Sequence, residues 1–99
     1  MNLFSLEGKI AIVTGACGLI GKRHCEALAE AGAKVVVADV NAEMARSFAH
    51  GLGAEHIGLG IDVTNPESLL KAQTEILTKY GKIDVLVNNA AINDMFENP

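Results

Sequence analysis

Short, nearly continuous apolar runs alternate along the chain with longer segments in which apolar residues recur at helical spacing. Runs rich in Val and Ile fit strands that are buried on both faces, and the longer segments fit amphipathic helices. The pattern predicts strands at residues 9–14, 34–39, 56–61 and 83–87. It predicts helices at residues 19–31, from 42 to about 51–53, and 66–80. This alternation indicates βα units wound into a parallel sheet, as in an α/β fold.

Polar and glycine positions predict where the helices begin and end. Asn41 can cap the second helix, and Thr64 or Asn65 can cap the third. Gly32 and Gly81 stand where glycine ends the first and third helices. The predicted packing faces are Ile20, Ala27, Leu28 and Ala31 in the first helix, Met44, Ala45, Phe48 and Ala49 in the second, and Leu69, Ala72, Ile76, Leu77 and Tyr80 in the third.

Composition narrows the class of protein. With 99 residues, of which 49% are hydrophobic, the chain suits one compact unit and leaves no room for a second domain. A net charge of -4 without a run of Lys or Arg argues against binding to nucleic acid or to acidic membranes. The chain has neither a secretory leader nor an apolar run of the roughly 18–20 residues that cross a bilayer, so we expect a cytoplasmic protein.

Cys17 and Cys25 are interpreted as free thiols, and no ligand spacing around His24 predicts a metal site.

The glycines after the first predicted strand carry the first chemical signal. Gly15, Gly18 and Gly21 lie between a strand and a helix, which is the setting of a phosphate-binding turn. Glycine permits the tight bend and the close approach of the backbone to a pyrophosphate, and the helix N-terminus supplies N–H groups. The alternative is a purely structural set of glycines.

Asp39 ends the second predicted strand, near the roughly 20-residue offset at which an acid holds the adenosine ribose of a dinucleotide. A carboxylate at this point accepts hydrogen bonds from ribose hydroxyls and repels a 2′-phosphate. Residues 16–20 and 40–42 contain no basic side chain, so NAD is favoured over NADP. The alternative is a solvated acid in a strand-to-helix turn.

Four segments in one order carry a family resemblance. They are residues 6–15 (LEGKIAIVTG) with the turn at Gly18 and Gly21, Asp39, residues 62–64 (DVT), and residues 84–91 (DVLVNNAA). Together they resemble the N-terminal half of the short-chain dehydrogenase/reductase family. The resemblance implies a Rossmann-type, doubly wound parallel sheet with strand order 3-2-1-4, in which residues 1–99 form the NAD-binding part of one domain. Ligands in such sheets bind where the winding reverses, at the C-terminal strand ends.

The resemblance also implies roles for individual residues. The diphosphate would lie on the glycine turn, the adenine ribose on Asp39, the adenine on Asp62 and Val63, and the rest of the cofactor along the segment after the fourth strand. Asn88 would stabilise the sheet. The alternative for Asp62 is a residue that only shapes the turn before the third helix. The alternative for Asn88 and Asn89 is that they form the polar end of the fourth strand. The cofactor-binding residues so predicted are Gly15, Cys17, Gly18, Leu19, Ile20, Gly21, Asp39, Asp62, Val63, Asn89, Ala90 and Ala91.

Two positions depart from the pattern of the short-form members. The short form has TGxxxGxG, whereas Leu19 gives this chain TGxxGxxG, the spacing of extended relatives that act on nucleotide sugars. Ala91 also replaces the glycine of the short-form NNAG segment. The segment Asn88-Asn89-Ala90 resembles the short form more closely, so that form is favoured.

The family's catalytic Ser, Tyr and Lys come after the NNAG segment. Tyr80 is the only Tyr, and Asp84 stands four residues later, so the chain has no YxxxK pair and no predicted catalytic residue. We therefore expect the N-terminal part of an NAD-dependent oxidoreductase that transfers hydride between a small alcohol or ketone and nicotinamide. By the resemblance, the parent is a homodimer or homotetramer. The alternatives are a non-catalytic dinucleotide-binding module and an extended-type nucleotide-sugar epimerase or dehydratase.

Overall fold

Strands and helices alternate strictly in the computed structural model, which describes residues 5–89. The strands are β1 (Ile10–Thr14), β2 (Lys34–Asp39), β3 (Ile57–Gly60) and β4 (Val85–Asn88). The helices are α1 (Leu19–Glu30), α2 (Ala42–Leu52) and α3 (Pro66–Tyr80). Each element lies within about two residues of its predicted bounds.

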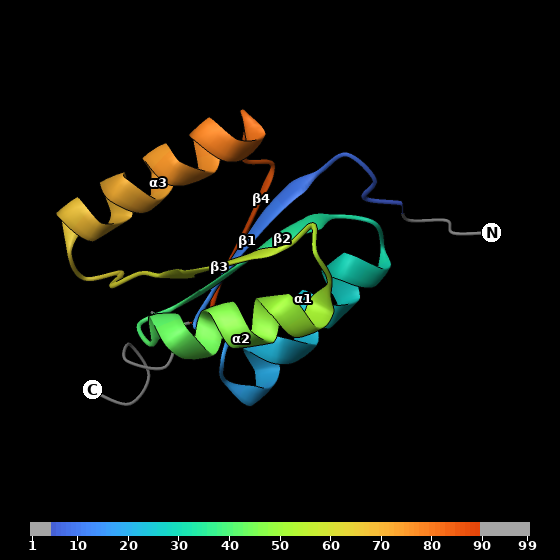
Figure 1. Ribbon diagram of the computed structural model, residues 1–99, viewed down its shortest axis with the longest axis horizontal. Helices are drawn as coiled ribbons and strands as arrows, with labels where there is room; N and C mark the ends of the chain where they lie inside the picture. The colour runs from blue at the N-terminus through green and yellow to red at the C-terminus, as the bar shows by residue number, and fades with distance from the viewer. Residues whose placement is uncertain (1–4, 90–99) are drawn as a thin grey trace.

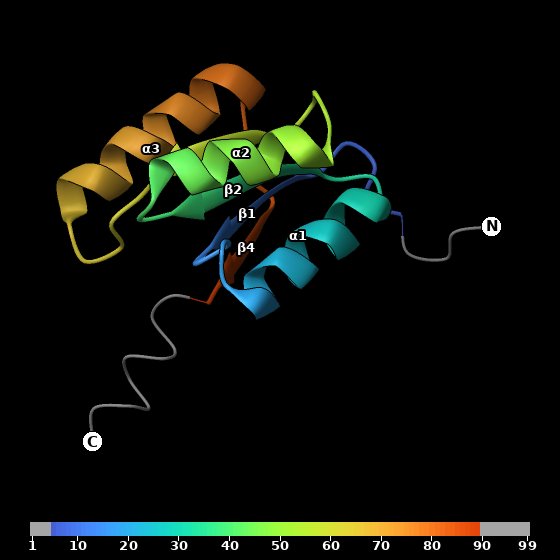
Figure 2. The same ribbon diagram turned by 60° about the horizontal axis from the view of Figure 1, so that its bottom comes forward.

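The strands form one parallel sheet in the order β3-β2-β1-β4, which confirms the predicted Rossmann-type topology. At its centre, Ile12 of β1 stands beside Val36 of β2 on one side and Leu86 of β4 on the other. Figures 1 and 2 show α1 and α2 on one face of the sheet and α3 on the opposite face. The winding therefore reverses between β1 and β4, and the C-terminal strand ends at this reversal are the expected ligand edge.

Successive side chains of β1 and β2 point to opposite faces of the sheet and belong to two separate hydrophobic cores. Ile12 and Val36 point to the face covered by α3, where Ile76 is almost fully buried. Val13 and Val37 point to the opposite face, beneath α1 and α2. Because β1 and β2 are covered on both faces, their sequences are apolar at successive positions rather than at every second one.

Helix packing differs from the predicted stripes. In α1, Gly21 and Cys25 are buried, whereas Ile20 of the predicted face is 66% exposed. In α2 and α3, the predicted members Ala45, Ala49, Ala72 and Ile76 are buried, whereas Met44, Leu69 and Leu77 of the same predicted faces are exposed. The predicted faces of α2 and α3 are thus confirmed in part, and the prediction was wrong for α1, whose two buried residues lie outside the predicted face.

Two glycines explain why β3 is the weakest strand signal in the sequence. A Cβ on Gly58 would lie 2.4 Å from the backbone of Ala45, and one on Gly60 would lie 2.7 Å from the Cβ of Ala42. The backbone of α2 therefore rests directly on β3. A glycine inside a strand often marks such a close approach of another backbone.

The fourth strand begins later than predicted because a side chain takes the place of a ladder bond. The amide of Ile10 donates to Oδ2 of Asp84 at 2.8 Å, and the amide of Asp84 donates to the carbonyl of Ile10 at 2.9 Å. The hydrogen bond from the Ile10 amide lowers the pKa of Asp84, and Lys82 lowers it further. Regular pairing of β4 with β1 starts at Val85.

Candidate functional site

The glycine turn joins β1 to α1 by a bend that other residues do not fit. Gly15 has a φ of 62°, in the left-handed region that favours glycine. A Cβ on Gly21 would lie 2.4 Å from the carbonyl oxygen of Gly15, so only glycine lets the first turn of α1 pack against this bend. Gly18 differs, because its added Cβ would make only an ordinary contact at 3.6 Å.

The N-terminus of α1 is built differently from those of the other helices. The side chains of Asn41 and Asn65 accept hydrogen bonds from the first-turn amides of α2 and α3. At α1 the capping position is Gly18, which offers no side-chain cap. The first-turn N–H groups of α1 are thus left to a ligand or to solvent, and a helix N-terminus of this kind suits phosphate.

The carboxylate of Asp39 is bonded to the glycine turn. Its Oδ2 accepts a hydrogen bond from the amide of Cys17 at 3.0 Å, and its Oδ1 accepts one from the amide of Asn41 at 3.1 Å. The acid therefore holds the turn against the end of β2. Burial raises the pKa of the Cys17 thiol, and the charge of Asp39 raises it further, so the thiol stays protonated at neutral pH.

Main-chain hydrogen bonds tie the four strand ends to one another. Ala16 donates to Ala38 at 3.0 Å, and Ile61 donates to the carbonyl of Asp39 at 2.9 Å. On the other side, the amide of Asn89 donates to the carbonyl of Thr14 at 3.3 Å. The structure thus brings the glycine turn, Asp39, the segment before Asp62 and Asn89 to one edge of the sheet.

The end of β4 contributes a polar pair and one unsatisfied atom. The hydroxyl of Thr14 donates to Oδ1 of Asn88 at 2.8 Å, which fits the predicted role of Asn88 in holding the sheet together. The side-chain nitrogen of Asn89 is buried and has no hydrogen-bond partner within residues 5–89. A buried donor of this kind calls for an acceptor, which a bound ligand can supply.

Asp62 and Val63 follow β3 at the same edge. The Oδ1 of Asp62 accepts hydrogen bonds from the hydroxyl of Thr64 at 2.6 Å and from its amide at 3.0 Å, and these bonds lower the pKa of Asp62. Val63 packs partly against the core beneath α3. The Asp62 carboxylate thus organises a turn, and its adenine-binding role stays a prediction.

The remaining predicted residues divide into exposed and undescribed ones. Leu19 is 79% exposed and Ile20 is 66% exposed, which is unusual for apolar side chains at the start of a packed helix. Both lie at the N-terminus of α1, where a ligand on the turn would cover them. Ala90 and Ala91 lie outside the described residues.

These residues fit a dinucleotide. The chain offers an uncapped helix N-terminus after a glycine bend, an acid at the end of the next strand, and a buried amide donor at the end of β4. A family model for short chain dehydrogenases matches residues 9–98. The chain belongs to the short chain dehydrogenase family.

Several relatives in this family are similar over most of the chain. This chain is 41% identical over 90 residues to a sorbitol dehydrogenase of Cereibacter sphaeroides. The matched region covers 91% of this chain and 35% of the relative. The chain is 44% identical over 88 residues to a 3-oxoacyl-(acyl-carrier-protein) reductase of Vibrio cholerae, covering 89% of this chain and 36% of the relative. The chain thus spans little more than a third of the length of these relatives.

A solved member of the family has the same architecture. The crystal structure of a hydroxysteroid dehydrogenase from Escherichia coli superposes with a TM-score of 0.79 at 39% identity, covering 86% of this chain and 37% of that one. The chain therefore shares its fold with a solved member of the family.

Tyr80 lies away from this site. Its hydroxyl donates to the carbonyl of Glu55 at 2.9 Å, where α3 ends beside the start of β3. Burial raises the pKa of Tyr80, and the negative charge of Glu55 adds to the effect. These contacts give Tyr80 the packing role that we expect for it.

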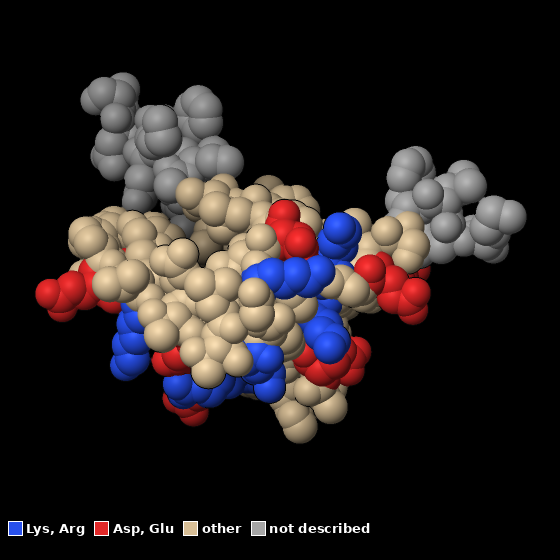
Figure 3. Space-filling view, turned by 90° about the horizontal axis from the view of Figure 1, so that it is seen from above, with Lys and Arg blue, Asp and Glu red and all other residues tan. Residues whose placement is uncertain are grey.

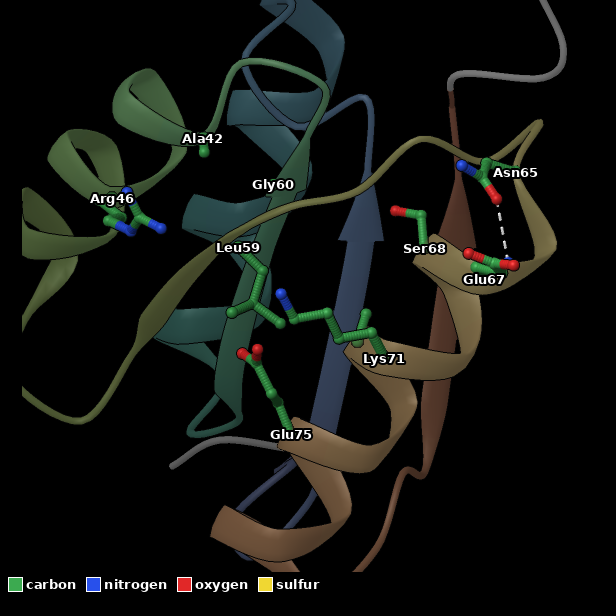
Figure 4. A pocket seen from close by; sticks show the side chains of 10 residues that line it. Ala42, Arg46, Leu59, Gly60, Asn65, Glu67, Ser68, Lys71 and Glu75 are labelled. Carbon is green, nitrogen blue, oxygen red and sulfur yellow. Dashed lines mark hydrogen bonds between the residues drawn. The ribbon is translucent and has the colours of Figure 1, made fainter.

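A hollow that the sequence did not reveal lies along the free edge of β3. It has a volume of about 480 Å³ and contains none of the predicted site residues. Figure 4 shows Arg46 of α2 on one side of the strand and Lys71 and Glu75 of α3 on the other. Charges of both signs face this hollow, so it has no clear preference for an anion or a cation.

The surface offers few further features. On the face that carries α3, Lys and Arg side chains lie beside Asp and Glu side chains rather than in a patch of one sign (Figure 3). Between residues 5 and 89, no helix is both long enough and apolar enough to cross a lipid bilayer.

Proposed function

We propose that this chain is the NAD-binding part of an enzyme that transfers hydride between a small alcohol and the corresponding ketone or aldehyde. The observation that carries the proposal is the hydrogen bond between the Asp39 carboxylate and the Cys17 amide of the glycine turn. It sets the acid that we propose to bind the ribose directly beside the bend that we propose to bind the phosphates. Relatives named as a sorbitol dehydrogenase and a 3-oxoacyl reductase support an alcohol and carbonyl couple.

Each part of the site would hold one part of the cofactor. The first-turn amides of α1 would donate to the diphosphate, and the Asp39 carboxylate would accept from the ribose hydroxyls. Asp62 and Val63 would flank the adenine, and the buried side-chain nitrogen of Asn89 would donate towards the nicotinamide half. Bound NAD supplies the hydride chemistry, while these residues bind and orient it.

The preference for NAD follows from charge. Asp39 presents a carboxylate where a 2′-phosphate would extend, and residues 40–42 provide no cation against it. We further propose a cytoplasmic homodimer or homotetramer as the working form.

The test is calorimetric titration of the protein with NAD and NADP. We expect Asp39→Ala to weaken NAD binding by roughly ten- to hundredfold, since hydrogen bonds to charged groups contribute about 1.5–3 kcal/mol. We also expect it to reduce the difference between the affinities for NAD and NADP. Asp62→Ala tests the adenine prediction separately. Unchanged NAD affinity in Asp39→Ala would remove the ribose role.

A second candidate follows from the glycine spacing. Glycines at 15, 18 and 21 favour an extended-type epimerase or dehydratase acting on nucleotide sugars. In the enzyme of which we propose this chain to be a part, turnover of an alcohol with net reduction of NAD supports the first proposal. Interconversion of nucleotide sugars without net NAD reduction supports the second.

A further inference from the structure

The free edge of β3 lies in a hollow that the proposed coenzyme site does not use. β3 is the last strand in the order β3-β2-β1-β4, so within residues 5–89 only β2 pairs with it. The hollow of about 480 Å³ is lined by Leu59 and Gly60 of β3 together with residues of α2 and α3 (Figure 4). An unpaired strand edge therefore lies in a groove between two helices.

The hydrogen-bonding groups on this edge belong to two glycines. The amide of Ile61 donates to the carbonyl of Asp39 on β2 at 2.9 Å. Along a β-strand, the N–H and C=O of one residue point to one edge, and those of the next residue point to the other edge. The main-chain groups of Leu59 thus face β2 like those of Ile61, and the main-chain groups of Gly58 and Gly60 face the groove.

The two walls of the groove differ in charge. Arg46 lines the wall formed by α2, and Glu67, Lys71 and Glu75 line the wall formed by α3. None of these four side chains takes part in an ion pair within residues 5–89. The α2 wall is therefore positive, whereas the α3 wall carries two acids against one cation. All four charges are available to a partner.

An extended peptide fits this groove better than a second copy of the chain does. The main chain of a peptide would pair with Gly58 and Gly60 as an added strand, and its successive side chains would point to opposite faces of the sheet. One side chain would then meet Arg46 below α2, and the next would meet Glu75 below α3. A second copy is disfavoured, because its own β3 also lies between two helices.

We propose that the free edge of β3 binds an extended segment of a partner protein in which an acidic residue and a basic residue are adjacent. The acid pairs with Arg46, and the base pairs with the acids of the α3 wall. Gly58 and Gly60 supply the main-chain bonds. This docking surface contains none of the residues proposed to bind NAD, so it does not depend on the proposed function.

The test titrates the ¹⁵N-labelled full chain with capped hexapeptides in NMR spectra. The peptide TVEKVT should shift the amide signals of Gly58 and Gly60 and slow their hydrogen exchange. TVKKVT, which places a cation against each wall, should bind about two- to fivefold more weakly, as expected for an exposed charge pair. Methylation of the two central amide nitrogens of TVEKVT should abolish binding, because it removes the main-chain donors.

Arg46→Glu tests the charge pairing within the same groove. This variant should bind TVKKVT more tightly than TVEKVT, the reverse of the unmodified chain. Arg23→Glu is the matched control, because Arg23 is an exposed arginine of α1 and does not line the groove. It should leave the order of the two peptides unchanged, and circular dichroism checks that both variants are folded.

Three results would overturn the proposal. Unmoved Gly58 and Gly60 signals with both peptides would mean that the wall charges only protect the edge from pairing. Equal binding of the methylated peptide would reduce the interaction to contacts with the charged walls. Shifts of these two signals with protein concentration, in the absence of peptide, would assign the edge to a second copy of the chain.

Discussion

Replacing Gly21 with alanine tests whether the close contact between α1 and the glycine bend is as tight as the structure shows. The added Cβ would lie 2.4 Å from the carbonyl oxygen of Gly15 and 2.7 Å from Cα of Ala16. Both obstacles are backbone atoms, so no side-chain rotation relieves them. The start of α1 or the bend itself has to move.

The magnitude follows from two opposing effects. Overpacking of a well-packed site costs about 1–3 kcal/mol, and the absence of a movable side chain favours the upper half of this range. Alanine is also a better helix former than glycine by up to about 1 kcal/mol in a helix interior, and by less in the first turn where Gly21 lies. We therefore expect Gly21→Ala to lower the free energy of unfolding by about 1–2 kcal/mol.

The assay is urea unfolding followed by far-UV circular dichroism, with linear extrapolation to water. Gly51→Ala is the matched control, because Gly51 also lies in a helix and an added Cβ would meet nothing within 4 Å. That variant should gain up to about 0.5 kcal/mol from helix propensity alone, because Gly51 lies in the last turn of α2. If Gly21→Ala proves as stable as Gly51→Ala, the argument from backbone contact is refuted.

Three further predictions concern other parts of the fold. His56→Ala should lower the free energy of unfolding by about 1–3 kcal/mol in urea titrations, because the buried amide of Val35 loses its acceptor, Nδ1 of His56 at 2.9 Å. The Ile10 amide holds the pKa of Asp84 below its ordinary value, so the ionised carboxylate stabilises the fold above that ordinary value and this stabilisation is lost as pH falls through the lowered one. Asp84→Asn should flatten this part of a pH series of unfolding curves, and an unchanged acid slope would contradict the assignment. Burial raises the pKa of Cys25 to about 12, so iodoacetamide at mildly alkaline pH should label Cys25 only after unfolding, as read by mass spectrometry.

The sequence was sufficient for the order of the elements and for the sheet edge at which the predicted site residues meet. Apolar runs at residues 9–14 and 34–39 indicated strands that are covered on both faces, and the structure buries β1 along its whole length. The glycine triplet and Asp39 were identified by their spacing, and the structure joins them through the Cys17 amide. These signals depend on residues that are close in the sequence or on a recurrent motif, so a single sequence is enough to identify them.

The parts that the sequence did not predict depend on contacts between distant segments. The buried positions of α1 are Gly21 and Cys25, and an added Cβ on Gly21 would meet the backbone of Gly15 and Ala16, which precede the helix. The position of Lys22 beside an aromatic ring was likewise not predicted. Its relation to Phe48 exists only once α1 and α2 are side by side.

The direct contact of α2 with Gly58 limits how the outer strand can be altered. An engineer seeking a stiffer strand would be drawn to replace Gly58 with valine, since β-branched residues favour strands. Such a side chain would push α2 away from the sheet at Ala45. The segment that carries Asn41 would move with it, and the Asp39 carboxylate accepts a hydrogen bond from the Asn41 amide. A substitution meant to stiffen β3 would therefore be expected to disturb the Asp39 carboxylate, and with it the coenzyme binding that we propose for this residue.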